Sequence, residues 1–195
     1  MNHLPPDHET MLASWQQHTH AEFLLKDPDA ALASMTEAPY VICIPSGAGG
    51  VGRPAVRKFY AEQFLPSIPA DFELESLSQI FSHDRIVEEF VVRFTHTLKM
   101  DWMLPGLRPT GRKAELVMVL IIQFAAGKIA REHAYWDQAA VLSQLGLLDE
   151  PIAAAGVGSA AELLRLSALP MRPARNSPSI SARADAPDTY THLRS

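Results

Sequence analysis

The chain has 195 residues, of which 47% are hydrophobic and 20% charged, and its formal net charge is −5. This length and composition predict one globular domain with tails. The dispersed acidic excess argues against binding to a nucleic acid, and no window approaches the roughly 20 apolar residues of a membrane span. Cys43 is the single cysteine, which excludes an internal disulfide. With no export signal at the N-terminus, we expect a cytoplasmic protein.

The first part of the chain is predicted to be largely helical. Apolar residues recur at helical spacing over residues 7–26, and Asp27-Pro28 is a typical start for a second helix. The stretch "PYVICIP" (39–45) predicts a short strand, and Pro54 opens a further helix. The residues expected on the buried face of that helix are Val56, Phe59, Tyr60 and Phe64.

From residue 72 onward the pattern changes to strands. Alternating stretches predict strands at 72–81, 85–99 and 114–124, with a fourth beginning at Ile129 and a short helix at 138–146. Helices followed by an antiparallel meander indicate the α+β class, with one curved sheet wrapped around the N-terminal helices.

The predicted domain spans residues 7–150. Residues 151–169 are predicted to form a short helical extension, and the Pro-, Ser- and Arg-rich residues 170–195 are predicted to form a disordered tail. The strand at 114–124 is apolar on both faces, although a sheet covered by helices on one side should alternate more cleanly. We therefore expect a homodimer formed through the sheet.

The segment "GAGGVG" satisfies the G-x-G-x-x-G pattern of dinucleotide-binding folds at Gly47, Gly49 and Gly52. Its context does not fit, because Arg53-Pro54 starts the helix after the pattern and the later strands favour hairpins. A flexible loop beside a pocket mouth is the preferred interpretation, with nucleotide binding a weak alternative. We expect no cofactor.

The pair His18 and His20 predicts no metal site, because helical residues two apart point in different directions, and surface histidines are the simpler interpretation. The last strand is more informative. Arg131, His133, Tyr135 and Asp137 share one face, while Glu132, Ala134 and Trp136 share the other.

Two rows of side chains could together form a pocket. On the second strand Phe90, Val92, Phe94 and His96 share a face. If both rows face the concave side of the sheet, the catalytic candidates are Asp137, His133, His96 and Tyr135, and the substrate-binding candidates are Trp15, Phe90, Phe94, Trp102, Met103 and Met118. A purely structural interpretation remains open, in which Asp137 caps the following helix, Arg131 and Glu132 face solvent, and His133 is a satisfied buried histidine.

Three stretches resemble the SnoaL-like branch of the nuclear transport factor 2-like superfamily: "GRPAVRKFYAEQF", "MDWMLPGLRPTGRKAEL" and "GKIAREHAYWDQAAVLSQLGLL". The resemblance covers roughly residues 10–150. It implies a cone-shaped α+β barrel whose curved, mixed, mostly antiparallel sheet closes around an open pocket, usually in a dimer. Polyketide cyclases of this branch use an aspartate for acid–base chemistry, and Asp137 is the best match to it.

The leading functional hypothesis is therefore a cofactor-independent acid–base enzyme of the isomerase, cyclase or lyase type, acting on a small, mostly apolar carbonyl compound. Asp137 would move the proton, His133 or Tyr135 would polarise the oxygen, and His96 would orient the ligand. The alternative is a non-catalytic ligand-binding protein or accessory dimer module.

Overall fold

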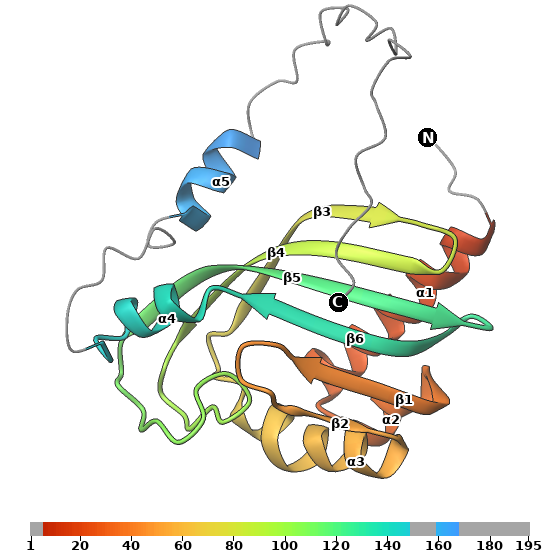
Figure 1. Ribbon diagram of the computed structural model, residues 1–195, viewed down its shortest axis with the longest axis horizontal. Coiled ribbons are helices and arrows are strands. Elements are labelled where there is room, and N and C mark those ends of the chain that lie inside the picture. Colours follow the sequence, from red (N-terminus) through yellow and green to blue (C-terminus); the bar gives the residue numbers. More distant parts are fainter. Residues whose placement is uncertain (1–5, 149–158, 168–195) are drawn as a thin grey trace, which may run out of the picture.

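The structure is a computed structural model that describes residues 6–148 and 159–167. The helical elements alternate with strands only in the first third of the chain, and a four-stranded meander follows (Figure 1). In chain order the elements are α1 (Pro6–His20), η1 (Ala21–Leu25), α2 (Pro28–Ala33), β1 (Met35–Cys43), β2 (Gly49–Val51), α3 (Arg53–Lys58), η2 (Phe59–Phe64), η3 (Leu65–Ser67), β3 (Glu73–Phe81), β4 (Arg85–Thr95), β5 (Lys113–Ala125), β6 (Lys128–Trp136), α4 (Gln138–Gln144) and α5 (Ser159–Ser167).

All six strands belong to one sheet in the order β2-β1-β6-β5-β4-β3. The pairing of β1 with β6 is parallel, and every other pairing is antiparallel. The expected α+β class and the mixed, mostly antiparallel sheet are confirmed. The sheet is open, because its edge strands β2 and β3 do not pair with each other.

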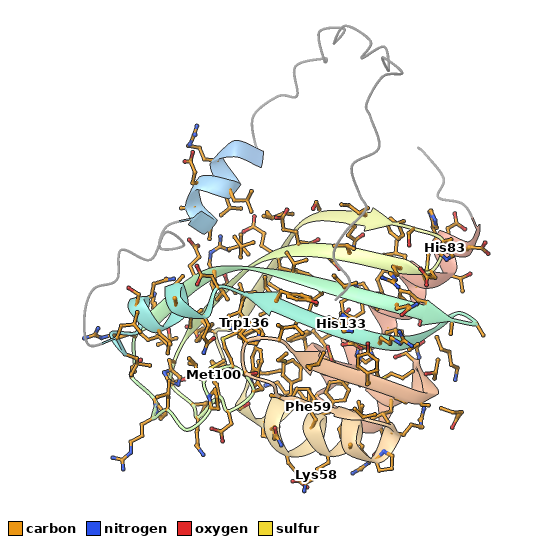
Figure 2. All side chains as sticks on the ribbon, in the orientation of Figure 1. Lys58, Phe59, His83, Met100, His133 and Trp136 are labelled. Carbon is orange, nitrogen blue, oxygen red and sulfur yellow. The ribbon has the colours of Figure 1, made fainter. Side chains whose placement is uncertain are left out.

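The core lies between the sheet and the N-terminal helices. Helix α1 crosses behind the sheet in Figure 1, and α2 and α3 lie beside β1. Figure 2 shows the layer of side chains that fills this space, with Phe59 on the α3 side and Trp136 at the end of β6. Both rings are buried, with 2% and 8% of their surface exposed. The concave face of the sheet is therefore the face that the helices close.

Two helix starts are built as the sequence predicts. Asp27 Oδ1 accepts hydrogen bonds from the backbone N–H groups of Asp29 and Ala30 at 2.8 and 3.1 Å, and Pro28 occupies the first helical position. Before α4, Asp137 accepts one from Ala140 N at 3.0 Å. Such caps satisfy donors that a helix end leaves without an intrahelical partner.

The glycine-rich segment is a hairpin and not the start of a nucleotide-binding helix. Gly49–Val51 forms β2 and pairs antiparallel with residues 40–42 of β1. Gly49 has φ +142°, and a Cβ there would lie 2.0 Å from the carbonyl oxygen of Val41. Gly49 therefore allows the close approach of the β1 and β2 backbones. The expected flexible loop is a paired strand.

The C-terminal part of the described chain is one short helix. Helix α5 falls within the predicted extension 151–169 and contacts β5. The predicted tail 170–195 lies outside the described residues. No helix among the residues that the structure describes is long and apolar enough to cross a membrane.

Candidate functional site

A cavity of about 420 Å³ opens between the sheet and the helices α1 to η2. Its size is within the range of small-molecule sites, roughly 300–1,000 Å³. Aromatic side chains form much of its wall: Trp15, Phe23, Phe59, Tyr60, Phe64, Phe72, Phe90 and Trp102. Polar groups lie at separate places on this wall, so the cavity is an apolar container with defined polar positions.

The predicted wall residues are mostly in place. Trp15, Phe90, Trp102 and Met118 line the cavity. Phe94 and Met103 do not. Both are buried in the surrounding core, where the Phe94 ring stacks on Phe72 with centroids 6.0 Å apart. They lie in the core around the cavity and not on its predicted wall.

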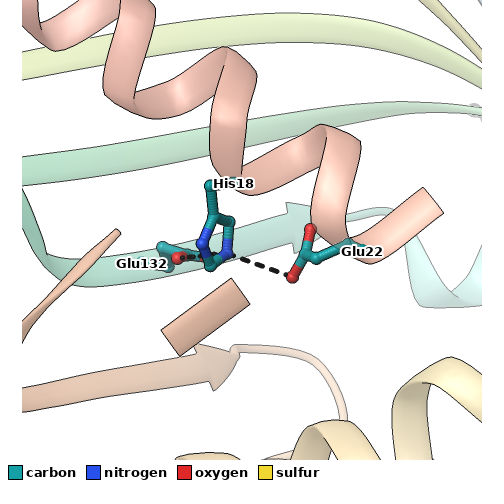
Figure 3. A group of neighbouring side chains, drawn as sticks. All are labelled: His18, Glu22 and Glu132. Atoms are coloured by element: carbon teal, nitrogen blue, oxygen red, sulfur yellow. Dashed lines mark ion pairs between the residues drawn. The ribbon is translucent and has the colours of Figure 1, made fainter. Parts of the chain in front are cut away.

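The most concentrated group of polar side chains surrounds His18, which is 0% exposed. Its Nε2 lies 3.2 Å from Glu22 Oε1, 3.2 Å from Glu132 Oε1 and 3.1 Å from the Tyr60 hydroxyl. Figure 3 shows the imidazole between the two carboxylates, with Glu132 coming from the sheet and Glu22 from the helical side. Glu22, Tyr60 and Glu132 line the cavity. We call His18, Glu22, Tyr60 and Glu132 the His18 cluster.

The other side of the imidazole is held firmly. His18 Nδ1 lies 3.0 Å from the Ala31 carbonyl oxygen and 2.8 Å from Ser34 Oγ. Since the carbonyl can only accept, Nδ1–H donates to it, and this bond orients Nε2 toward the carboxylates. Glu132 Oε1, although only 3.2 Å from Nε2, has no hydrogen-bond partner among the described residues. This oxygen retains its capacity to accept a bond.

Local helix geometry delivers two members of the cluster. Helix α1 continues into the π-helical segment η1, which carries Glu22, and α3 continues into η2, which carries Tyr60. A π-helical turn re-aims side chains relative to an α-helix and is frequent at functional sites. On α1 and η1, Met11, Trp15, His18 and Glu22 follow one stripe at helical spacing, which places the polar pair on the core-facing side.

Burial and the neighbouring charges shift the pKa of His18 in opposite directions. Burial alone lowers the pKa of an imidazole, but the nearby charges of Glu132 and Glu22 outweigh it and raise the pKa of His18 well above 6.5. His18 is thus an imidazolium at neutral pH, and it compensates one of the two carboxylate charges beside it.

The remaining groups hold their protons more tightly than usual. Burial raises the pKa of Glu22, with the charge of His18 opposing the shift, and burial raises the pKa of Tyr60 well above 10. Cys43, which also lines the cavity, has its pKa raised to about 12, mainly by burial. Tyr60 therefore acts as a neutral hydrogen-bond donor, and the Cys43 thiol is poorly suited to act as a nucleophile.

The same group contains the side chains that would hold a metal ion. His18 Nε2 and one carboxylate oxygen each from Glu22 and Glu132 lie within 4.8 Å of one another, and they form the metal-capable group found among the described residues. Imidazole and carboxylate are ordinary zinc ligands. The sequence pattern predicts His18 on the surface, but its side chain is fully buried. That interpretation is wrong, although exposed His20 fits it.

A second polar position lies on β4. Glu88 is 3% exposed and lines the cavity. Its Oε2 accepts a hydrogen bond from Trp15 Nε1 at 2.6 Å, and its Oε1 accepts one from Ser76 Oγ at 2.6 Å. The Trp15 ring also stacks on His18, with centroids 5.8 Å apart. Trp15 thus links the two polar positions of the cavity.

None of the four predicted catalytic residues lines the cavity. Tyr135 is 38% exposed, and the Tyr40 hydroxyl lies 2.7 Å from His133 Nε2 on the side of the sheet away from the cavity. Asp137 is exposed and caps α4, as the structural interpretation allowed. The expected row of proton-moving groups on β6 exists, but its predicted direction is wrong.

His96 is buried but also lies away from the cavity. It follows β4, and its Nδ1 accepts from Thr110 N at 3.4 Å. Burial lowers the pKa of His96. It is not brought together with His133 or Asp137 at one ligand position, so the predicted constellation is corrected as a whole.

The physical reason is the choice of face on β6. Across the sheet Phe90 pairs with Met118, and Met118 pairs with Trp136. Because strand residues alternate, the inward row of β6 contains Glu132, Ala134 and Trp136. A shift of one residue along β6 moves every side chain to the opposite face of the sheet. On β6 the row that ends in Trp136 is the more apolar one, and this indicates that it faces inward. On α1 the apolar stripe that contains Trp15 also contains His18, and this indicates that His18 is buried.

Comparisons with known proteins agree with this architecture. The structure defines a cone-like α+β protein whose open sheet and helices enclose a ligand-sized cavity. The sequence model of the SnoaL-like domain matches residues 15–132, and the chain belongs to this family. A search of curated protein sequences gives no match.

Solved structures show the same fold. A SnoaL-like protein of the polyketide cyclase type from a Jannaschia species has a TM-score of 0.60 at 15% identity, covering 76% of this chain and 99% of its own. An NTF2-like protein of unknown function from Burkholderia pseudomallei has a TM-score of 0.53 at 22% identity, covering 70% and 97%. TerC, crystallised with polyporic acid, has a TM-score of 0.51 at 20% identity, covering 73% and 99%. At these identities the likeness establishes the fold alone.

Proposed function

We propose that the protein binds a small, mostly apolar carbonyl compound in the aromatic cavity and moves a proton at the carbon next to the carbonyl. The observation that carries this proposal is the His18 cluster, in which Glu22, Tyr60 and Glu132 reach the cavity around a buried imidazolium. Buried pairs of titratable groups with different environments are typical of acid–base sites.

The chemistry of the four groups assigns each a role. Glu132, whose Oε1 lies 3.2 Å from the His18 imidazolium and meets the hydrogen-bond geometry with none of the described residues, is the general base. Glu22 shares the positive charge of His18 with Glu132, and the neutral Tyr60 hydroxyl donates a hydrogen bond to the substrate oxygen. His18 stabilises the carboxylates and fixes their positions. Glu132 removes a proton from the carbon next to the carbonyl, the Tyr60 hydroxyl stabilises the enolate oxygen, and the protonated Glu132 returns a proton to the same carbon.

The test is proton exchange in heavy water with para-ethylacetophenone, a methyl ketone whose aromatic ring suits the cavity wall. We expect the protein to accelerate the replacement of the acetyl methyl protons, which are next to the carbonyl, by deuterium. The exchange is measured by NMR. Glu132→Gln should slow the exchange by about 10²–10⁴-fold, the usual contribution of a positioned base. Glu89→Gln is the matched control, because Glu89 neighbours Glu88 on β4 but does not line the cavity.

Two outcomes would contradict the acid–base role. Exchange that is equally fast with Glu132→Gln would remove Glu132 as the base. Binding of the ketone with no accelerated exchange would favour the alternative of a ligand-binding protein without catalysis.

We also propose a homodimer through the outer face of the sheet. Val117, Val119 and Ile121 of β5 face away from the cavity and are only half-buried, and Val119 pairs with the exposed Tyr135 of β6. A contiguous apolar patch of this kind is a frequent site of association between subunits.

A further inference from the structure

The charge of the cavity is one-sided. Three carboxylates line it, those of Glu22, Glu88 and Glu132, and none of the lining residues, all of which the structure describes, is Lys or Arg. The buried imidazolium of His18 compensates one carboxylate of its own cluster. Glu88 has no such cation beside it. Burying a carboxylate without a positively charged partner costs free energy. A ligand that fills this cavity can supply the missing positive charge.

The Glu88 carboxylate is held in a fixed position and can accept further hydrogen bonds from a ligand. The donors Trp15 Nε1 and Ser76 Oγ each bond to a different oxygen of its carboxylate, which fixes the position of that group. Each carboxylate oxygen can accept more than one hydrogen bond, so acceptor capacity remains at both. A neutral hydroxyl could use that capacity but would leave the negative charge uncompensated.

The surroundings of Glu88 suit an organic cation. The indole of Trp15 touches the carboxylate, and Phe90, two residues further along β4, lies on the same cavity wall. Positively charged nitrogen is attracted to the faces of aromatic rings, most strongly to those of tryptophan. A metal ion is less suitable here, because the metal-capable group of the described residues is at His18 and does not include Glu88.

The sheet sets the distance between the two polar positions. Glu88 pairs with Leu120, which pairs with Ala134, and Glu132 lies two residues from Ala134 on β6. Two strand spacings sideways and two residues along the strand place the backbones of Glu88 and Glu132 roughly 12 Å apart. A ligand of one aromatic ring with a substituent at each end can therefore reach toward both.

We propose that the natural ligand carries a positively charged nitrogen, a protonated or quaternary amine, which Glu88 and the Trp15 ring bind while the carbonyl group meets the His18 cluster. This inference rests on the proposed function for the carbonyl end and adds the substrate class. Glu88 is thus a specificity-determining residue, remote from the proton transfer.

The test compares the binding of two ketones of nearly equal shape to the full chain. para-(Aminomethyl)acetophenone carries an ammonium group where para-ethylacetophenone carries a methyl group. Binding is followed by calorimetry and by the fluorescence of Trp15 and Trp102, which line the cavity. We expect wild-type protein to bind the amine about tenfold or more tightly, the usual effect of one charge-assisted hydrogen bond.

Glu88→Gln should reduce this preference to about one, because the amide keeps the shape and removes the charge. Glu89→Gln, the same substitution on the neighbouring residue, should retain the full preference. para-Acetylbenzoate, an anion of similar shape, should bind more weakly than either ketone, and this comparison needs no variant at all.

Equal affinity of wild-type protein for the two ketones, or no binding of either, would overturn the inference. Survival of the preference in folded Glu88→Gln would also overturn it. Failure of the proposed function gives a different result, namely amine-selective binding without accelerated deuterium exchange.

Discussion

His18→Asn is the substitution that probes the His18 cluster most sharply. Asparagine retains a short polar side chain on the Ala31 and Ser34 side of the ring but removes Nε2 and its positive charge. Two carboxylates, from Glu22 and Glu132, would then face each other in a buried site without a cation. The variant therefore tests whether the imidazolium holds the cluster together.

The expected cost can be worked from these contacts. Removing one partner of a buried ion pair costs about 3–5 kcal/mol, because the other charge is left uncompensated. Glu22 can relieve part of this cost by binding a proton, since burial already raises its pKa. We therefore expect a loss of about 3 kcal/mol at pH 7, the lower end of that range.

The assay is urea unfolding followed by circular dichroism. His20→Asn is the control, because His20 is exposed on the same helix and should change the free energy of unfolding by less than about 0.5 kcal/mol. Adding Glu22→Gln to His18→Asn should restore at least about 1 kcal/mol, since it removes the like charge. A loss below about 1 kcal/mol for His18→Asn, with no coupling to Glu22, would refute the reasoning.

Three further predictions concern pH, a helix cap and the outer face of the sheet. The raised pKa of His18 gives stability that is fully present below about pH 6.5, the unfolded value, and is lost as the pH rises through the folded value. Urea unfolding should thus show stability falling above pH 6.5, by at most about 1.4 kcal/mol per pH unit for this proton, and an unchanged slope in His18→Asn would contradict it. Asp137→Ala should cost about 1 kcal/mol through the lost α4 cap while ketone exchange is retained, and loss of exchange in the folded variant would return Asp137 to the site. Val119→Lys should convert the proposed dimer to a monomer in light scattering, whereas a monomeric wild type would rule the dimer out.

Much of the fold is predictable because its signals are local. Asp27-Pro28 specifies a helix start by itself, and the alternation from residue 72 specifies strands without knowledge of their neighbours. The parallel pairing of β1 with β6 depends on residues about 90 positions apart, and the family resemblance was the only indication of a mixed sheet.

The site was harder to predict because it depends on which face of each element points inward. On β5 both faces are apolar, so its sequence does not indicate which face of the neighbouring strand β6 points to the core. His133 and Tyr135 were chosen for their chemistry, but Glu132 is the residue that reaches the cavity. His18 was missed for the opposite reason: a polar residue in an apolar stripe was interpreted as surface, when the stripe itself placed it in the core.

The charged state of the His18 cluster is tested most directly by titrating His18 with ¹⁵N NMR, with and without the bound ketone. We expect both ring nitrogens of His18 to stay protonated well above pH 6.5, and its Nε2 signal to shift when the ketone enters the cavity. His20, exposed on the same helix, provides the reference signal. Titration of His18 at or below pH 6.5, with no response to the ketone, would contradict the existence of a charged acid–base cluster at this cavity.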